Sequence, residues 1–522
     1  MARPIPLAPP VITATLPSIS CILCAPRFLL SDESAKHTIS PPVDSGLEQK
    51  KVKRNVSNAT NTAFQLPEPG LIPPLEPEFR PAVLANRAFR AAVIDVGGVP
   101  LVLGLERGDG SVSRYETQVF PESDDQAAAN FPYVERILKF LLWQRGAWRV
   151  HVGGPKSIAD FLKKTYSPKG DRAFDYEFMG DKVYEKPFTI ESCPPDDVPA
   201  ECDATQPLGR HLEGCRIGFD LGASDRKVSA VIDGEAVFSE EVVWEPRKNT
   251  DPEYHYHEIK KALEMAASKL PRVDAIGGSS AGVLVNNRVM VASLFRGIPA
   301  DRYDAVRGIF MRIREEMGVP LEIVNDGEVT ALAGSMSLED NPVLGIALGS
   351  SEAGGYVTPE GNITGWLNEL AFAPIAYHAD APVDEWSGDC GTGALYLSQQ
   401  CPFRLANKAG INLPEGVTDA EKLKHIQAAL EEGHAGAEAI WTTMGYALGY
   451  ALAHYADFYT LKHVLVLGRC TSGRGGDLLV KHAREVLAKE FPNLAKTIEV
   501  QLPDEQARRV GQSIAAASLP AL

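Results

Sequence analysis

The pattern of apolar and polar positions divides the chain into three regions. Residues 1–85 show no apolar periodicity and are rich in Pro, Ser, Thr and Asn, so they cannot bury enough apolar surface to offset the entropy lost on ordering. Residues 88–190 contain short apolar runs, and from residue 214 such runs alternate with stretches of helical spacing. We predict a disordered or targeting tail at 1–85, a small α/β accessory domain at 88–190 and a larger α/β domain at 214–515.

The accessory region has the pattern of a small sheet covered by helices. Its apolar runs predict a strand at Ala91–Val96 and then a hairpin with Asp109-Gly110 at its tip. A helix at Tyr133–Trp143 follows, and a strand at Arg149–Val152 leads through a Gly-Gly-Pro turn into a helix at Ser157–Lys164.

Strands and helices alternate along the larger domain. The predicted strands are Arg216–Asp220, Lys227–Ile232, Glu235–Val243, Val273–Gly277, Leu321–Asn325, Val343–Leu348, Gly355–Thr358 and His463–Leu467. The predicted helices are Tyr256–Leu270, Tyr303–Met317, Gly327–Met336, Ala437–Thr460 and Gly476–Glu490. Strand–turn–strand and strand–turn–helix units in this order predict an α/β fold with mixed sheets.

Charge and cysteine content narrow the function classes. The formal net charge is −16, which repels phosphate backbones, so we expect no nucleic-acid partner, although backbone N–H groups can still hold a small nucleotide. No apolar run reaches the length of a membrane span. Eight cysteines without regular spacing imply no disulfide framework, so a reducing, cytoplasmic location is expected. The basic cluster at residues 50–54 leaves organelle targeting as an alternative.

A strand that ends in a carboxylate leads into a turn of small residues near residue 220. Asp220 ends the strand, Gly222, Ala223 and Ser224 follow, and Lys227 lies just beyond them. Small residues let backbone N–H groups approach phosphate oxygens, and an aspartate can hold Mg²⁺ through water. Taken alone, such a turn is more often structural.

Two further turns follow predicted strands. Gly349, Ser350 and Ser351 connect two strands, and two hairpins of this kind that face each other can grip a triphosphate from both sides. Gly468 ends a later strand, and its turn is a candidate adenine site.

Asp326 lies where a predicted strand ends and a helix begins. A carboxylate in that place can accept the proton of an attacking hydroxyl, and phosphoryl transfer needs little else beyond positioning and charge neutralisation. The structural alternative is a helix N-cap. The order and spacing of all these turns favour the chemical interpretation.

In this order, the motifs resemble those of the ROK (repressor, open reading frame, kinase) family in the superfamily of sugar kinases, actin and heat-shock ATPases. The resemblance runs from residue 214 to residue 515. It covers Asp220–Lys227, Ile276–Gly282, Asn325–Gly334, Gly349–Gly355, Asn368–Phe372, Cys390–Ser398 and Val466–Gly473. It implies a two-lobed actin-like ATPase fold of the ribonuclease H-like kind, and a homodimer.

The resemblance also implies roles for residues of this chain. ATP and Mg²⁺ would be the cofactors, with a sugar-like small molecule as the substrate. Asp326 would be the catalytic base and Asp220 would help to hold Mg²⁺, while the two glycine turns cradle the phosphates. Glu369 would touch the acceptor, with Asn325 and Arg296 as further candidates.

The sequence departs from the family pattern on the acceptor side. Phe372 stands where the family has a histidine, and Cys390 alone remains of the cysteine loop, so we predict no zinc because one thiol cannot make a structural zinc site. Leu294 stands where an asparagine contacts the sugar. Arg296 is either a ligand for an acidic group of the acceptor or, as we favour, the surface partner of Asp301.

These observations predict an ATP-dependent kinase, a phosphotransferase with an alcohol acceptor. Because the acceptor-side motifs are eroded, the alternative is a catalytically weak sensor of sugar or nucleotide, or a scaffold. A repressor is disfavoured, since no helix–turn–helix pattern precedes residue 214.

Overall fold

The computed structural model describes residues 66–203, 208–222, 225–503 and 505–522. Most of the predicted tail therefore lies outside the described residues. The chain already packs before residue 85, however. The Leu71 N–H donates to Glu490 Oε1 at 2.8 Å and to the Tyr450 hydroxyl at 3.1 Å, and the Leu75 N–H donates to Thr443 Oγ1 at 3.2 Å. The Pro-rich composition of residues 1–85 as a whole gave no indication of these contacts near position 75.

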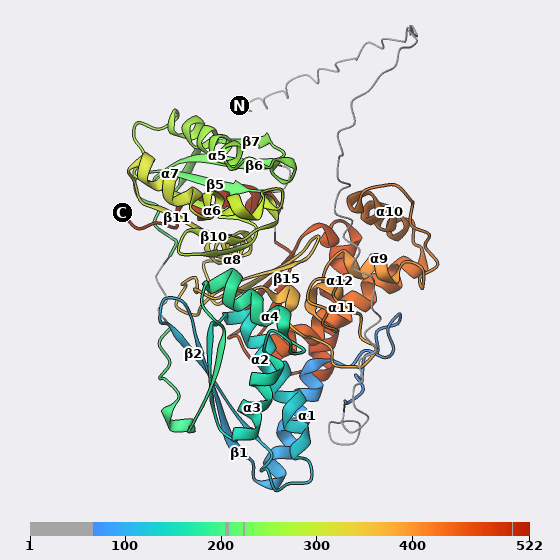
Figure 1. Cartoon of the computed structure of the whole chain (residues 1–522). Helices are drawn as coiled ribbons and strands as arrows, with labels where there is room; N and C mark the ends of the chain where they lie inside the picture. The colour runs from blue at the N-terminus through green and yellow to red at the C-terminus, as the bar shows by residue number, and fades with distance from the viewer. Residues whose placement is uncertain (1–65, 204–207, 223–224, 504) are drawn as a thin grey trace, which may run out of the picture. The chain divides into compact units, whose positions relative to one another are not determined.

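The first part of the described chain is an α/β unit, here called the N-terminal unit (residues 82–193). It contains α1 (Ala82–Val96), β1 (Val99–Glu106), β2 (Val112–Val119), α2 (Asn130–Arg145), β3 (Arg149–Gly153), α3 (Lys156–Thr165), α4 (Ala173–Glu177) and β4 (Thr189–Cys193). The strands pair in the order β2-β1-β3-β4, and Figure 1 shows α1–α4 beside the β1–β2 hairpin.

The predicted strand at Ala91–Val96 is wrong, because these residues end helix α1. Buried residues at positions 82, 83, 85, 86, 89 and 93 of this helix follow helical spacing, and Gly97 ends it in the left-handed conformation with φ 77°. An apolar run of six residues does not by itself distinguish a strand from the end of a buried helix. The predicted hairpin, the helix at Tyr133–Trp143 and the strand at Arg149–Val152 are confirmed.

A five-stranded sheet forms the first lobe (residues 215–325). The elements are β5 (Cys215–Leu221), β6 (Asp225–Ile232), β7 (Glu235–Val243), α5 (Pro252–Ala267), β8 (Ala275–Ser280), β9 (Val283–Val285), β10 (Arg288–Val291), α6 (Tyr303–Arg307), α7 (Ile309–Met317) and β11 (Leu321–Asn325). The order is β11-β8-β5-β6-β7, in which β5, β8 and β11 are parallel and β6 runs opposite to its neighbours. The predicted helix at Tyr303–Met317 is interrupted at Gly308.

The second lobe (residues 326–517) repeats this arrangement. Its elements are α8 (Asp326–Leu338), β12 (Val343–Leu348), β13 (Glu352–Val357), α9 (Gln400–Leu405), α10 (Asp419–Glu431), α11 (Ala435–Tyr455), β14 (His463–Leu467), α12 (Arg474–Glu490), β15 (Glu499–Gln501) and α13 (Glu505–Ala517). The order is β13-β12-β14-β15, with β12, β14 and β15 parallel and β13 antiparallel. A single bridge between Val357 and Ile363 stands where the first lobe has its third strand.

The two lobes exchange a helix. Helix α8 follows the last strand of the first lobe but packs on β12 and β13, whereas α13 follows the last strand of the second lobe but packs on β5 and β8. Glycine residues in β5 and β8 let α13 pack closely on the first sheet. A Cβ at Gly277 would lie 1.8 Å from the Ala516 carbonyl oxygen, and a Cβ at Gly218 would lie 2.1 Å from the Ser513 carbonyl oxygen. The chain from residue 215 therefore has the two-lobed ribonuclease H-like fold of the actin-like ATPases.

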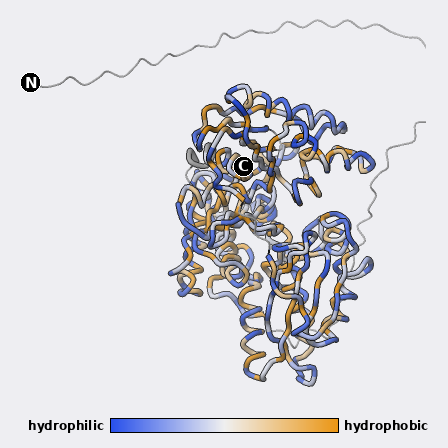
Figure 2. The backbone as a smooth tube through the Cα atoms, turned by 90° about the vertical axis from the view of Figure 1, so that its left-hand side faces the viewer, coloured by the Kyte–Doolittle hydropathy of each residue, from blue (hydrophilic) through white to orange (hydrophobic). Residues whose placement is uncertain are grey.

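Apolar residues gather into separate cores. One core joins the N-terminal unit to the second lobe and includes only the β9–β10 hairpin from the first lobe, which otherwise has a core of its own around β5, β8, α5 and α7. Hydrophobic and hydrophilic segments alternate along the backbone in Figure 2, as expected for elements that bury one face. In the described part of the chain, we find no helix with the length and apolar content needed to span a bilayer.

Candidate functional site

The carboxyl ends of three parallel strands meet at one edge of the first lobe. In the sheet register Asp220 of β5 lies opposite Ser279 of β8, and Asn325 of β11 lies opposite Ser280. The Ser279 hydroxyl donates to Asp220 Oδ1 at 2.6 Å. Asp220 lies close enough to Asp326 that its negative charge raises the pKa of Asp326.

Asp326 is the first residue of α8 and is half-buried. Its Oδ1 accepts a 3.0 Å hydrogen bond from the Gly327 N–H. Loss of hydration raises the pKa of Asp326 to about 6, with the negative charge of Asp220 as the second cause. A carboxylate that is partly exposed but has lost much of its hydration is in the kind of environment in which catalytic bases are found.

Strand β13, which follows the turn after β12, lies against the start of α8. A Cβ at Gly327 would lie only 2.3 Å from the Gly354 carbonyl oxygen, so glycine is needed where α8 meets β13. Gly349 opens this turn, its N–H donates to the Ser351 carbonyl at 3.0 Å, and both Ser350 and Ser351 are exposed. Two exposed hydroxyls and a small residue thus lie in the turn that the sequence proposed as a phosphate cradle.

Gly468 belongs to the same sheet edge as Gly349. Ala347 of β12 pairs with Leu467 of β14, so the turns that follow these strands are neighbours. Gly468 has φ 102°, and a Cβ there would lie 2.5 Å from the Leu348 carbonyl oxygen, so both its conformation and the space available require glycine.

The first predicted phosphate turn is only partly described. Ala223 and Ser224 lie outside the described residues. The Gly222 N–H donates to the Asp225 carbonyl at 2.9 Å, and Lys227 Nζ lies 3.9 Å from Asp225 Oδ1 and 4.0 Å from Glu241 Oε2. Burial raises the pKa of Asp220, opposed by the bond from Ser279 and by the charge of Lys227.

These carboxylates fit a hydrated Mg²⁺ ion. Asp220 and Asp326 share one sheet edge, and their negative charges, with raised pKa values, are those that a divalent cation would neutralise. No three His, Cys, Asp or Glu side chains converge as a metal ligand set in the residues that the structure describes. Mg²⁺ commonly uses one or two carboxylates and keeps several waters, so a complete protein cage is not required.

Glu369 lies close enough to Asp326 to feel its negative charge. Its side chain is half-buried, and burial followed by the charge of Asp326 raises its pKa to about 7. Glu328 is a further candidate that no sequence motif indicated: it is buried one turn into α8, and burial raises its pKa to about 8, with Glu369 adding to the effect. Its position in a predicted helix gave no sign that it lies near a second acidic residue.

The remaining acceptor-side candidates, Asn325 and Arg296, have other neighbours. Asn325 uses its amide within the protein, because Oδ1 accepts from the Gly327 N–H at 2.7 Å and Nδ2 donates to the Gly282 carbonyl at 2.9 Å. Arg296 is exposed, and the favoured pairing with Asp301 is wrong, because no ion pair joins them among the described residues. Arg296 instead lies near Arg247, whose pKa is lowered first by burial and then by the charge of Arg296.

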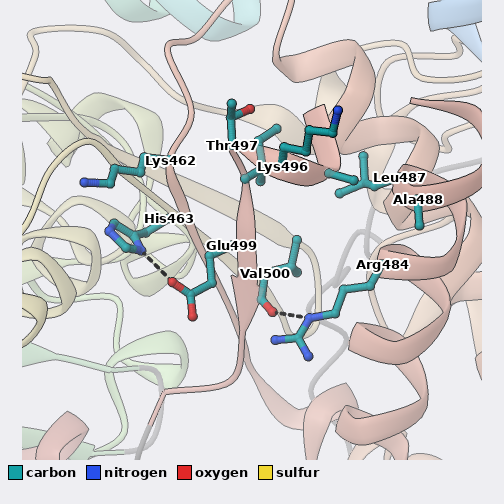
Figure 3. Close-up of a pocket in the computed structure, with 11 residues that line it drawn as sticks. Lys462, His463, Arg484, Leu487, Ala488, Lys496, Thr497, Glu499 and Val500 are labelled. Carbon is teal, nitrogen blue, oxygen red and sulfur yellow. Dashed lines mark hydrogen bonds and ion pairs between the residues drawn. The ribbon is translucent and has the colours of Figure 1, made fainter. Parts of the chain in front are cut away.

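A surface hollow of about 500 Å³ lies elsewhere, at the edge formed by β14, β15 and α12 (Figure 3). Its charged lining includes Lys462, His463, Arg484, Lys496 and Glu499. His463 Nδ1 lies 3.4 Å from Glu499 Oε2, and Arg484 Nε donates to the Val500 carbonyl at 2.9 Å. The hollow contains none of the predicted site residues, so its size does not identify the candidate site.

Several solved structures are similar to this chain. The ROK hexokinase from Thermus thermophilus matches with a TM-score of 0.46 and 17% identity, over 58% of this chain and 97% of its own. A ROK family glucokinase from Streptomyces griseus, in complex with glucose and AMPPNP, matches with a TM-score of 0.42 and 20% identity, over 58% and 99%. A ROK family transcriptional regulator, a homologue of the E. coli MLC protein, matches with a TM-score of 0.45 and 17% identity, over 59% and 79%.

Neither a model of a protein family nor a curated protein matches the chain. The fold assignment rests on the repeated strand order and the exchanged helices described above. The three solved structures are ROK proteins, members of the family that the motifs of this sequence resemble.

Proposed function

We propose that this chain transfers the γ-phosphoryl group of ATP to a hydroxyl group of a sugar-like acceptor, with Asp326 as the general base. One observation carries the proposal: a half-buried carboxylate with a pKa of about 6 lies at the edge shared by β5 and β11, at the start of α8, where Gly327 packs against Gly354 of β13. A base with this pKa is mostly ionised at neutral pH and is still basic enough to accept a proton.

The residues act by holding groups in place. Asp326 takes the proton of the attacking hydroxyl, whose oxygen forms a bond to the γ-phosphorus as the bond from that phosphorus to the bridging oxygen of ADP breaks. Backbone N–H groups of Ser350 and Ser351 and the exposed hydroxyls of the same two residues bind phosphate oxygens. Glu369 accepts a hydrogen bond from another acceptor hydroxyl. Asp220 would hold Mg²⁺ through water, and the ion would supply positive charge near the phosphates.

A binding protein with weak turnover is the second candidate, and two observations favour it. The Asn325 amide already bonds Gly327 and Gly282, which leaves it fewer hydrogen-bonding groups for a sugar. Phe372 turns its ring toward Trp143, with 4.3 Å between ring centres. Such a protein would bind sugar and nucleotide with no increase in ADP release.

The substitution Asp326→Asn tests the proposal. We expect phosphoryl transfer to fall by about 10²–10⁴-fold, the usual contribution of a general base, while ATP still binds. ADP release against a panel of sugars in the presence of Mg²⁺ measures transfer, and calorimetry measures nucleotide binding. Asp301→Asn, an exposed aspartate of the first lobe, is the matched control. Transfer by Asp326→Asn at the wild-type rate would refute the assignment.

A further inference from the structure

The loop that carries Glu369 is held by the carboxyl end of α2, in the N-terminal unit. The Asn368 N–H donates to the Gln144 carbonyl at 2.8 Å, and the Glu369 N–H donates to the Trp143 carbonyl at 2.9 Å. The last four carbonyls of a helix have no partner within the helix, so they are free to bind N–H groups from elsewhere. The helix thus fixes the main chain at the residue whose carboxylate lies next to Asp326.

Side chains strengthen this contact. The ring of Phe372 packs on Trp143 at 4.3 Å between centres and also lies near Phe174 and Phe178, at 5.8 and 6.4 Å. Asn368 is buried with φ 50°, and its Oδ1 accepts from the Tyr459 hydroxyl at 2.9 Å. A buried residue in the left-handed conformation persists only where its surroundings determine it.

A buried ion cluster anchors α2 to a second loop, residues 388–393. It comprises three cations and three carboxylates, all at most 11% exposed: Arg136, Lys139, Arg172, Glu135, Asp175 and Asp389. Asp389 is the centre, with Arg172 Nη1 at 2.7 Å, Arg136 Nη1 at 2.9 Å and Lys139 Nζ at 3.3 Å.

This second loop is bonded to the chain that follows Phe372. The Gly393 N–H donates to the Ala373 carbonyl at 2.9 Å, and the Ile375 N–H donates to the Gly391 carbonyl at 2.8 Å. Helix α2 therefore contacts the Glu369 loop directly at one end and supports it through Asp389 from the side. Buried ion clusters add little net stability but impose one geometry when every member is paired.

We propose that α2 is a positioning element of the acceptor side of the site: it fixes the loop of residues 368–372 so that Glu369 stays beside Asp326. The inference rests on the proposed function for its kinetic consequence. The N-terminal unit then supports the substrate-binding loop of the second lobe. Its effect on the substrate passes through Glu369, and the supporting residues do not touch the substrate themselves: Trp143, Phe372, Lys139 and Asp389.

Hydrogen exchange of the full chain and steady-state kinetics test this together. Phe372→Ala should accelerate exchange of the amides in residues 366–372 by roughly tenfold or more, because they lose their bonds to α2. It should raise the acceptor KM at least tenfold and change the ATP KM less than twofold. Phe372→Tyr should restore both. Phe238→Ala removes a half-buried ring from β7 and should leave exchange at 366–372 unchanged.

A second variant guards against a simple folding defect. Lys139→Met combined with Asp175→Asn keeps the cluster neutral and the bond to Trp143 Nε1, but removes one of the three cations from Asp389. We expect the same local acceleration of exchange. Unchanged exchange at 366–372 in both variants, or equal rises in the two KM values, would overturn the proposal. If the wild type transfers no phosphoryl group, the proposed function fails and the exchange result alone decides whether α2 holds this loop.

Discussion

Glu352 offers a test of the electrostatics of the second lobe that does not depend on any activity. It is the first residue of β13, with only 2% of its surface exposed. Its Oε1 accepts from the Tyr455 hydroxyl at 3.0 Å, whereas Oε2 is buried and has no hydrogen-bond partner among the described residues. Burial raises the pKa of Glu352 to about 8, so the carboxyl group is mostly protonated at neutral pH.

The magnitude follows from the two pKa values. In the unfolded chain Glu352 ionises near its ordinary pKa of 4.5, so the folded state binds the proton more tightly. A group whose pKa is raised by folding contributes its full stability below the unfolded value and loses it as the pH rises through the folded value. Between pH 5 and pH 8 this loss amounts to about 3 kcal/mol of the free energy of unfolding.

Glu352→Gln removes this titration while keeping an oxygen that can accept from Tyr455. Urea unfolding, followed by tryptophan fluorescence from pH 5 to pH 8, measures the free energy of unfolding of both proteins. The stability of the variant minus that of the wild type should increase by about 3 kcal/mol over this range. Glu432→Gln, an exposed position, should show no such slope. A difference for Glu352→Gln that stays flat with pH would refute the reasoning.

Two further predictions concern pH. His454, buried in α11 against Phe140 and Phe458, has its pKa lowered to about 3, mainly by burial, so its contribution to stability is present above pH 6.5 and is lost as the pH falls. The wild type should therefore lose about 2 kcal/mol more than His454→Gln between pH 7 and pH 5, measured by urea unfolding; equal losses would contradict this. If Asp326 is the base, kcat/KM for the acceptor should rise about tenfold per pH unit below pH 6 and level off above it, whereas a flat profile from pH 5 to pH 7 would exclude a base with that pKa.

Local signals in the sequence predicted much of the fold. Asp233-Gly234 between alternating runs predicts a hairpin, and the structure has φ 48° and 84° at these residues, as a tight turn between β6 and β7 requires. Asp326 at a strand end followed by Gly327 is likewise a local pattern, and the structure places it at the edge shared with Asp220.

The supporting contacts were not predictable, because they join segments far apart in the chain. Lys139 and Asp389 are separated by 250 positions, and neither has a neighbour in sequence that reveals its partner. A fully buried lysine on α2 also breaks the expectation that charged side chains face water. The expectation that charged side chains face water correctly predicted that Arg296 is exposed. It could not predict that Arg247 is its neighbour.

The N-terminal unit makes unequal contacts with the two lobes. It shares a continuous apolar core with the second lobe, whereas its contacts with the first lobe are to the β9–β10 hairpin of that lobe and through the ion pairs of Glu185 with Arg288 and Arg307, at 2.7 and 3.0 Å. Surface ion pairs of this kind contribute about 0–1 kcal/mol each. If the two lobes moved apart, these ion pairs would therefore separate at little cost. The N-terminal unit would travel with the second lobe as one rigid body, and the bending would fall on the crossed helices α8 and α13.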